Sequence, residues 1–198
     1  MVACAPLILN DEVSRLLVLL GGGVEIRLVT LKDAQGLSDF HDRNADHIRR
    51  WEPARSSDYH SFSAWYQRLL DWQLEYKEGR AAHFLVALPE VSHIVATCSL
   101  TNIIRGPFQA CNMGYAVDRA FEGRGVMHLL CEHVITYAFR ELGLNRVMAN
   151  YMPENHRSAA LLKRLGFVVE GAAKRYLLIN GCWEDHVLAA RVKGGGVS

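Results

Sequence analysis

The chain has 198 residues, half of them apolar, which is enough to bury one sizeable core and predicts a single domain over residues 1–198. Lysine and arginine number 22 and aspartate and glutamate number 21, so the formal net charge is +1. Because this balance creates no long-range field, we expect no direct nucleic-acid partner and no membrane partner.

The first third of the chain predicts a β-hairpin followed by two helices. Two β-rich runs flank residues 21–23, which are all glycine, and the second run alternates apolar and polar residues. The first helix is expected to start at a cap on Asp33 and to stop before Pro53. The second is expected within residues 61–79, where aromatic and aliphatic residues recur at helical spacing.

The rest of the chain alternates further strands with two helices. Strands are predicted at 81–88, 93–105, 110–118, 146–153, 167–179 and 182–190, and helices at 125–142 and 155–166. The crossover through the first of these helices predicts that strands 110–118 and 146–153 are parallel neighbours. The expected fold class is therefore α+β, with a central mixed sheet flanked by helices, a core at about 14–192 and a short flexible tail at 193–198.

The five cysteines are odd in number and scattered, with no Cys-x-x-Cys pair, so we expect free thiols and no metal. The first residues lack a basic leader, and the apolar run LLVLLGGGV is far shorter than the ~20 residues that span a bilayer. A soluble, cytoplasmic protein is the expectation.

The stretch FEGRGVM, residues 121–127, places two glycines just before a helix. It can be a plain helix start, a nucleotide-binding loop or a cradle for another phosphate ester. A Walker loop needs Lys and then Ser or Thr after its last glycine, whereas two apolar residues follow Gly125. A dinucleotide fingerprint needs a small residue where His128 stands. A pyrophosphate cradle without catalytic metal remains, with Arg119 and Arg124 as charge partners.

Two motifs carry a family resemblance. The segment EGRGVM resembles the coenzyme A pyrophosphate loop of the GNAT N-acetyltransferases, although Glu122 and Met127 depart from the common pattern. We expect the Glu122 carboxylate to point away from the loop. The segment NHRSAALLKRLGF resembles the family's Asn-x-x-Ser-x-x-Leu motif followed by Gly-Phe. The residues that this resemblance assigns to the coenzyme are Tyr115, Ala116, Val117, Gly123, Arg124, Gly125, Val126, Met127, Asn155 and Ser158.

Longer stretches are similar to one group within that family, the bacterial ribosomal-protein alanine N-acetyltransferases. The stretches are HIRRWEPAR, NIIRGPFQACNMGY, MANYMPENHRS and RYLLINGCWEDHVL, and the similarity runs from about residue 24 to 190. It implies a GNAT-like fold, acetyl-CoA as donor and the N-terminal alanine of a small-subunit ribosomal protein as acceptor. The oligomeric state stays open between monomer and dimer.

The chemistry of this transfer asks little of a base, because an α-amino group titrates at about 7.7–8.0 and is partly neutral at pH 7. The resemblance implies direct transfer, with an oxyanion donor on the strand 114–117 and Ser158 as the donor that faces the coenzyme sulfur. Ser158 can instead only support the helix start. Many family members carry a base at the position of Asn112. A water relayed by another residue is the alternative, and its candidates are His186, Glu184, Asp185 and Glu52.

The acceptor groove is expected at Trp51, Glu52 and Trp183, because an indole and a carboxylate begin a loop after the first helix. Glu52 would attract a protonated peptide N-terminus, while Trp51 can equally close the core. Two other functions remain open: acetylation of a small amine or antibiotic, and a non-catalytic acyl-CoA-binding module.

Overall fold

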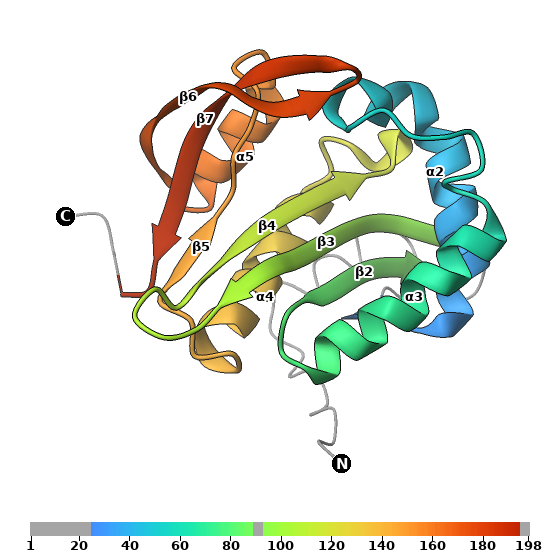
Figure 1. Cartoon of the computed structure of the whole chain (residues 1–198), viewed down its shortest axis with the longest axis horizontal. Helices are drawn as coiled ribbons and strands as arrows, with labels where there is room; N and C mark the ends of the chain where they lie inside the picture. The colour runs from blue at the N-terminus through green and yellow to red at the C-terminus, as the bar shows by residue number, and fades with distance from the viewer. Residues whose placement is uncertain (1–24, 89–92, 195–198) are drawn as a thin grey trace.

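The computed structural model describes residues 25–88 and 93–194, which form one seven-stranded mixed sheet with helices on both faces (Figure 1). The strand order is β1-β2-β3-β4-β5-β7-β6. This confirms the predicted fold class. The first strand of the predicted N-terminal hairpin lies outside the described residues, as does Cys4.

The strands follow the predicted runs closely. Their bounds are β1 Glu25–Leu28, β2 Ala82–Leu88, β3 His93–Ile104, β4 Ala110–Val117, β5 Arg146–Met148, β6 Val168–Ile179 and β7 Cys182–Val192. Neighbours pair antiparallel except β4 and β5, which are parallel, as the crossover predicted. The strand predicted at 146–153 is shorter than expected, because only three of its residues lie in the ladder beside β4.

Among the described residues, four α-helices cover the sheet. Helices α2 (Ala34–Ile48) and α3 (Phe62–Lys77) lie on one face, which we call the acceptor face, and α4 (Val126–Arg140) and α5 (His156–Arg164) lie on the other (Figure 1). In the part of the chain that the structure describes, no helix combines the length and apolarity needed to cross a membrane.

Each face of the sheet has its own apolar core. On the acceptor face, Phe40 of α2 and Leu69 of α3 pack with Leu85 of β2. On the opposite face, Leu130 of α4 and Leu162 of α5 belong to the larger core. Successive residues of a strand point to opposite faces, so a central strand such as β2, which is buried on both sides, is apolar at every position except His83. This explains the continuous apolar runs of the sequence.

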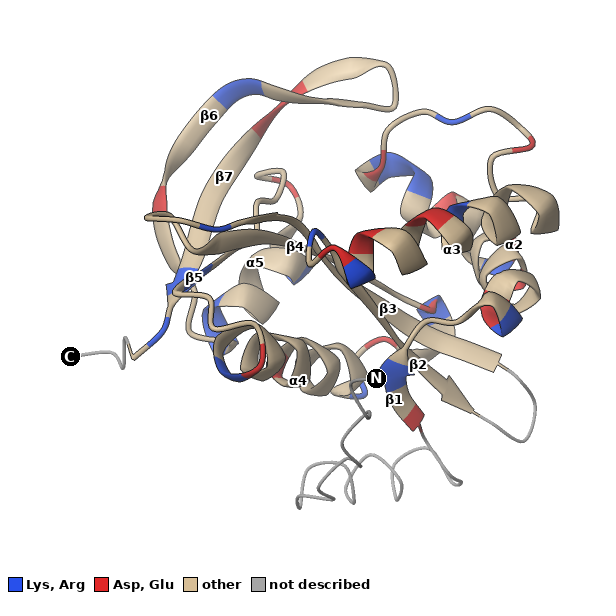
Figure 2. Ribbon diagram, turned by 60° about the horizontal axis from the view of Figure 1, so that its bottom comes forward, with Lys and Arg blue, Asp and Glu red and all other residues tan. Residues whose placement is uncertain are grey.

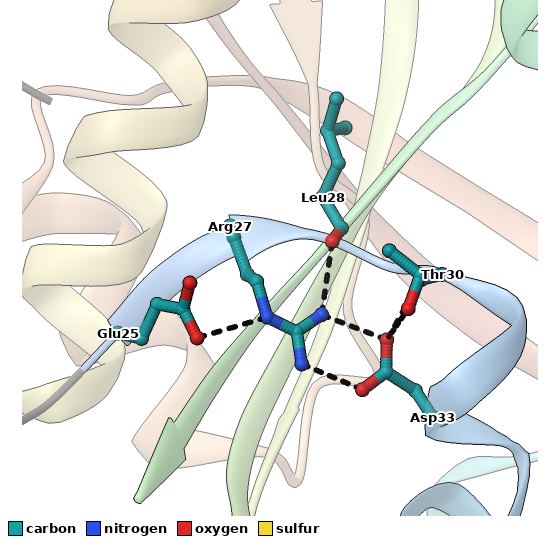
Figure 3. Close-up of polar contacts among 5 residues, drawn as sticks. All are labelled: Glu25, Arg27, Leu28, Thr30 and Asp33. Atoms are coloured by element: carbon teal, nitrogen blue, oxygen red, sulfur yellow. Dashed lines mark hydrogen bonds and ion pairs between the residues drawn. The ribbon is translucent and has the colours of Figure 1, made fainter. Parts of the chain in front are cut away.

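Helix α2 starts where the sequence predicts, with Asp33 as its N-cap residue, but the Asp33 side chain has another role. Asp33 is not a side-chain cap of this helix, and a short 3-10 turn, Leu31–Asp33, precedes it. The Asp33 carboxylate instead accepts two 2.7 Å hydrogen bonds from the Arg27 guanidinium and one from the backbone N–H of Thr30 (Figure 3). Burial opposes ionisation, but Arg27 and Thr30 hold the pKa of Asp33 below its ordinary value. The sequence pattern showed the acid but not its partner on β1.

Asp33→Asn should therefore lower the melting temperature most at neutral pH. A carboxylate whose pKa is depressed in the folded state stabilises it above the unfolded pKa, and the effect is lost as the pH falls through the folded value. The gap between variant and parent should stay constant near neutral pH and should narrow only as the pH falls below 3.8, the ordinary value of the carboxyl group. Asp39→Asn, at an exposed position of α2, is the matched control and should change little. A gap that stays constant with pH would contradict this account.

Candidate active site

Strands β4 and β5 separate beyond their last paired residues. Their ladder ends at Asn112 and Met148, after which β4 continues beside β3 while residues 149–151 follow β7 (Figure 1). We call this divergence the split. In an antiparallel pair the N–H and C=O groups alternate between the two edges, so β4 directs half of its backbone groups at residues 113–117 towards the split. Such groups can bind amides or an oxyanion.

The glycine loop lies at the carboxyl end of β4 and leads into α4. Gly123 and Gly125 have left-handed φ angles of +72° and +80°, and a Cβ added to either would meet nothing within 4 Å. Gly125 is the N-cap of α4, and the first N–H groups of a helix have no partner inside it. The open backbone and the helix dipole together fit a phosphate group.

Helix α2 supports the loop from the acceptor face. The Asn44 side-chain oxygen accepts a 2.9 Å hydrogen bond from the backbone N–H of Arg119, at the start of a short turn before the glycines. Asp118 caps that turn through the N–H of Ala120 and lies 3.3 Å from the Arg43 guanidinium. The loop is thus fixed to a helix about 75 residues earlier in the chain.

Glu122, which departs from the family pattern, ties three elements together. Its carboxylate lies 3.0 Å from Nε2 of His47 on α2 and 2.5 Å from the guanidinium of Arg157 on α5. Arg124 places its guanidinium over the ring of Phe121, 5.3 Å from the ring centre. The acid at this position therefore anchors the loop between two helices.

The second motif forms the start of α5. Asn155 is its N-cap and accepts a 3.0 Å hydrogen bond from the backbone N–H of Ser158. The Ser158 hydroxyl lies 2.6 Å from the phenol oxygen of Tyr115 on β4. Burial raises the pKa of Tyr115 well above its ordinary value, so the phenol keeps its proton. No spacing rule could have shown this contact between residues 43 apart.

Of the predicted acceptor residues, Glu52 contacts the hairpin between β6 and β7. The carbonyl of Glu52 accepts a 3.1 Å hydrogen bond from the N–H of Asn180, so the loop after α2 touches the turn between β6 and β7 (Figure 2). Trp51 is half-buried beneath the Arg50 guanidinium, and Trp183 is 54% exposed. The structure brings Glu52 to the hairpin and leaves Trp183 on the surface.

Two histidines that the sequence did not single out lie beside Glu52. Ligand atoms of His41, Glu52 and His60 all lie within 4.8 Å of one another, and the two imidazole rings stack 4.0 Å apart. Burial lowers the pKa of His41 to about 3, with His60 and Arg68 acting in the same direction. Burial also raises the pKa of Glu52, which Arg55 and Arg68 oppose. These groups can bind a cation, although the two arginines disfavour a divalent metal ion.

A cysteine nucleophile has little support. Burial raises the pKa of Cys111 to about 12 and that of Cys131 well above its ordinary value, so neither supplies a thiolate at neutral pH. Cys98 is also buried, and Cys182 is exposed on β7. The four described cysteines are free thiols, and direct transfer stays the simpler chemistry.

Comparisons with known proteins agree with the geometry. Residues 24–168 match the family model described as an acetyltransferase (GNAT) domain. The chain is 41% identical, over 83% of its length and 85% of the relative, to the [ribosomal protein uS5]-alanine N-acetyltransferase of Escherichia coli. A crystal structure of the ribosomal-protein-S5-alanine acetyltransferase from Vibrio fischeri has a TM-score of 0.84 and 38% identity, over 87% of this chain and 94% of that one. Mycobacterium smegmatis RimJ in complex with CoA-disulfide has a TM-score of 0.82 and 28% identity, over 88% and 84%.

Proposed function

Because the chain belongs to the GNAT acetyltransferase family, we propose that it moves the acetyl group of acetyl-CoA directly onto the N-terminal α-amine of a ribosomal protein that begins with alanine. The assignment of the acceptor rests on the sequence identity with the Escherichia coli enzyme, which extends over most of both chains. The cytoplasm, where ribosomal proteins are made, is the proposed site of action.

The donor occupies the split and the glycine loop in this proposal. Backbone groups of Tyr115, Ala116 and Val117 pair with the pantetheine amides, and the loop N–H groups bind the pyrophosphate. The residues of the loop that contribute are Gly123, Arg124, Gly125, Val126 and Met127. Support comes from the open backbone of both glycines and from the CoA-disulfide of the Mycobacterium smegmatis structure.

The transfer itself then needs two polarising groups. A β4 N–H at the split stabilises the oxyanion formed when the neutral amine attacks the carbonyl carbon of the thioester. In this proposal the phenol of Tyr115 donates its hydrogen bond to the Ser158 oxygen. The hydroxyl hydrogen of Ser158 is then free to bond the departing sulfur. Ser158 is thus the proposed catalytic donor, while Asn155 holds its backbone.

The acceptor ammonium is proposed to enter beside Glu52. An ammonium group has three N–H donors, and the Glu52 carboxylate with neutral His41 and His60 offers three acceptors. Three oxygen or nitrogen atoms at about 2.9 Å from one nitrogen lie about 4.7 Å apart, a spacing that this cluster permits because its three ligand atoms all lie within 4.8 Å of one another. Trp51 and Trp183 provide apolar walls for a small first residue.

Peptides beginning with Ala or Ser should be acetylated much faster than peptides beginning with Leu or Phe. The physical reason is that a bulky first side chain collides with the groove walls before its amine reaches the split. Mass spectrometry of a peptide library that differs only in the first residue measures this, with an internal lysine in each peptide as the control. Preference for that lysine or for free small amines would contradict the acceptor, and binding of acetyl-CoA without turnover on any amine would indicate a binding module.

A further inference from the structure

A second polar cluster lies at the split, on the strands opposite β4. The Asn150 side-chain amide donates a 3.2 Å hydrogen bond to the phenol oxygen of Tyr176, whose ring lies 5.5 Å from that of His186. His186 is only 4% exposed although it is an ionisable residue. Ionisable side chains are mostly exposed, so a buried imidazole held in one orientation beside the split is a candidate for a functional role.

The strand pattern directs this cluster to the acceptor face. Tyr151 pairs with Val187 and packs against the core on the α4 and α5 side. Because successive side chains of a strand alternate, the neighbours Asn150 and His186 point to the opposite face, where α2 and α3 lie. On β4, Ala116 packs on that same face. The cluster therefore lies on the side from which the amine is proposed to arrive.

Tyr176 lies in an irregular part of the hairpin between β6 and β7. The register of β6 against β7 shifts between Ala173 and Leu177, and Arg175 has a φ of +49°. Asp185 holds this irregularity, because its carboxylate accepts a 2.9 Å bond from the backbone N–H of Arg175 and a 2.6 Å bond from Lys174. Lys174 also lowers the pKa of Asp185. Asp185 thus has a structural task and is a poor proton acceptor.

The tautomer of His186 follows from its backbone contact. Its Nδ1 lies 3.1 Å from the carbonyl oxygen of Glu184, and a carbonyl oxygen only accepts hydrogen bonds. Nδ1 therefore carries the hydrogen in this contact. The lone pair of the neutral ring is then on Nε2, which is the atom that can accept a proton.

We propose that His186 is the general base of acetyl transfer, with Tyr176 and Asn150 as positioning residues; this inference rests on the proposed function. The amine nitrogen bonds to the acetyl carbon, and the carbon–sulfur bond breaks. Nε2 of His186 takes one proton from the arriving ammonium group and passes it to solvent, which leaves the neutral amine that attacks. The nitrogen loses its second proton to solvent as the new bond forms, and the sulfur leaves with a proton from Ser158, which solvent then restores, or from water. His186 supplies the acceptor that the Asn112 position lacks.

His186→Asn is the sharpest test, because its side-chain amide can keep the donor to the Glu184 carbonyl while removing Nε2. At pH 7 the turnover number should fall by about 10²–10⁴-fold with an unchanged acetyl-CoA dissociation constant. The deficit should shrink as the pH rises past about 8, because the amine then loses its proton to solvent unaided. The charged or titratable groups around the ring are Tyr176, Glu184 and Asp185 with its partner Lys174, and the variant retains them all.

His133→Asn on α4, packed against Phe84 on the other face of the sheet, is the control and should keep full turnover. Tyr176→Phe should give a smaller loss of turnover, and His186→Gln replaces the first variant if that one does not fold. The assay uses whichever amine the wild-type enzyme acetylates, so an acceptor other than an N-terminal alanine overturns the proposed function alone. Wild-type turnover in folded His186 variants, or a loss that does not change with pH, overturns the base assignment.

Discussion

Gly125→Val should raise the dissociation constant of acetyl-CoA by about 100-fold, a loss of about 2.7 kcal/mol. A valine Cβ at this position meets no protein atom within 4 Å and so projects into the space in front of the α4 N-terminus, where the pyrophosphate is proposed to bind. It also has to adopt a φ of +80°, which a β-branched residue resists. Calorimetric titration of acetyl-CoA into the purified variant measures the effect.

The matched control lies just beyond the other end of the same helix. Gly143 has a φ of +65°, and a Cβ there also meets nothing within 4 Å. Gly143→Val therefore imposes a similar backbone strain, but far from the glycine loop, and it should lower the melting temperature without changing the affinity for acetyl-CoA. Equal affinities of the two folded variants for acetyl-CoA would show that the glycine loop is not part of the coenzyme site.

The sheet could be predicted because its signals are local. Apolar runs of strand length, the Asn180–Gly181 turn and one helical crossover fix the strand types and the parallel pair of β4 and β5. The glycine loop was predictable for the same reason, since left-handed backbone before a helix needs glycine at Gly123 and Gly125. The backbone geometry of a motif within one short segment depends mainly on the residues of that segment, so it can be predicted from the sequence.

Contacts between distant segments could not be predicted. Tyr115 was assigned to the coenzyme for its backbone, and only the fold shows its phenol on Ser158. The imidazoles of His41 and His60 reach Glu52 from a helix and a loop whose relative position depends on tertiary packing. The pair of Asp33 with Arg27 joins residues only 6 apart, but it too depends on how β1 packs beside the turn before α2.

Ser158→Ala should lower the turnover number by about 10²–10⁴-fold while leaving the affinity for acetyl-CoA nearly unchanged. The hydroxyl is proposed to bond the sulfur only as negative charge develops on it, so its loss affects the transition state more than the bound donor. Tyr115→Phe leaves the serine in place but removes the phenol that orients it, and should give a smaller loss of the same kind.

Ser61→Ala separates this role from helix capping. Ser61 is the N-cap of α3 and accepts a hydrogen bond from the N–H of Ala64. Its loss should lower the stability by about 1 kcal/mol and leave the turnover number unchanged. Steady-state kinetics and thermal unfolding on the three variants and the parent distinguish the two roles. If Ser158→Ala behaves like Ser61→Ala, with a lower melting temperature and full turnover, the Ser158 hydroxyl only supports α5, and the departing sulfur must take its proton from water.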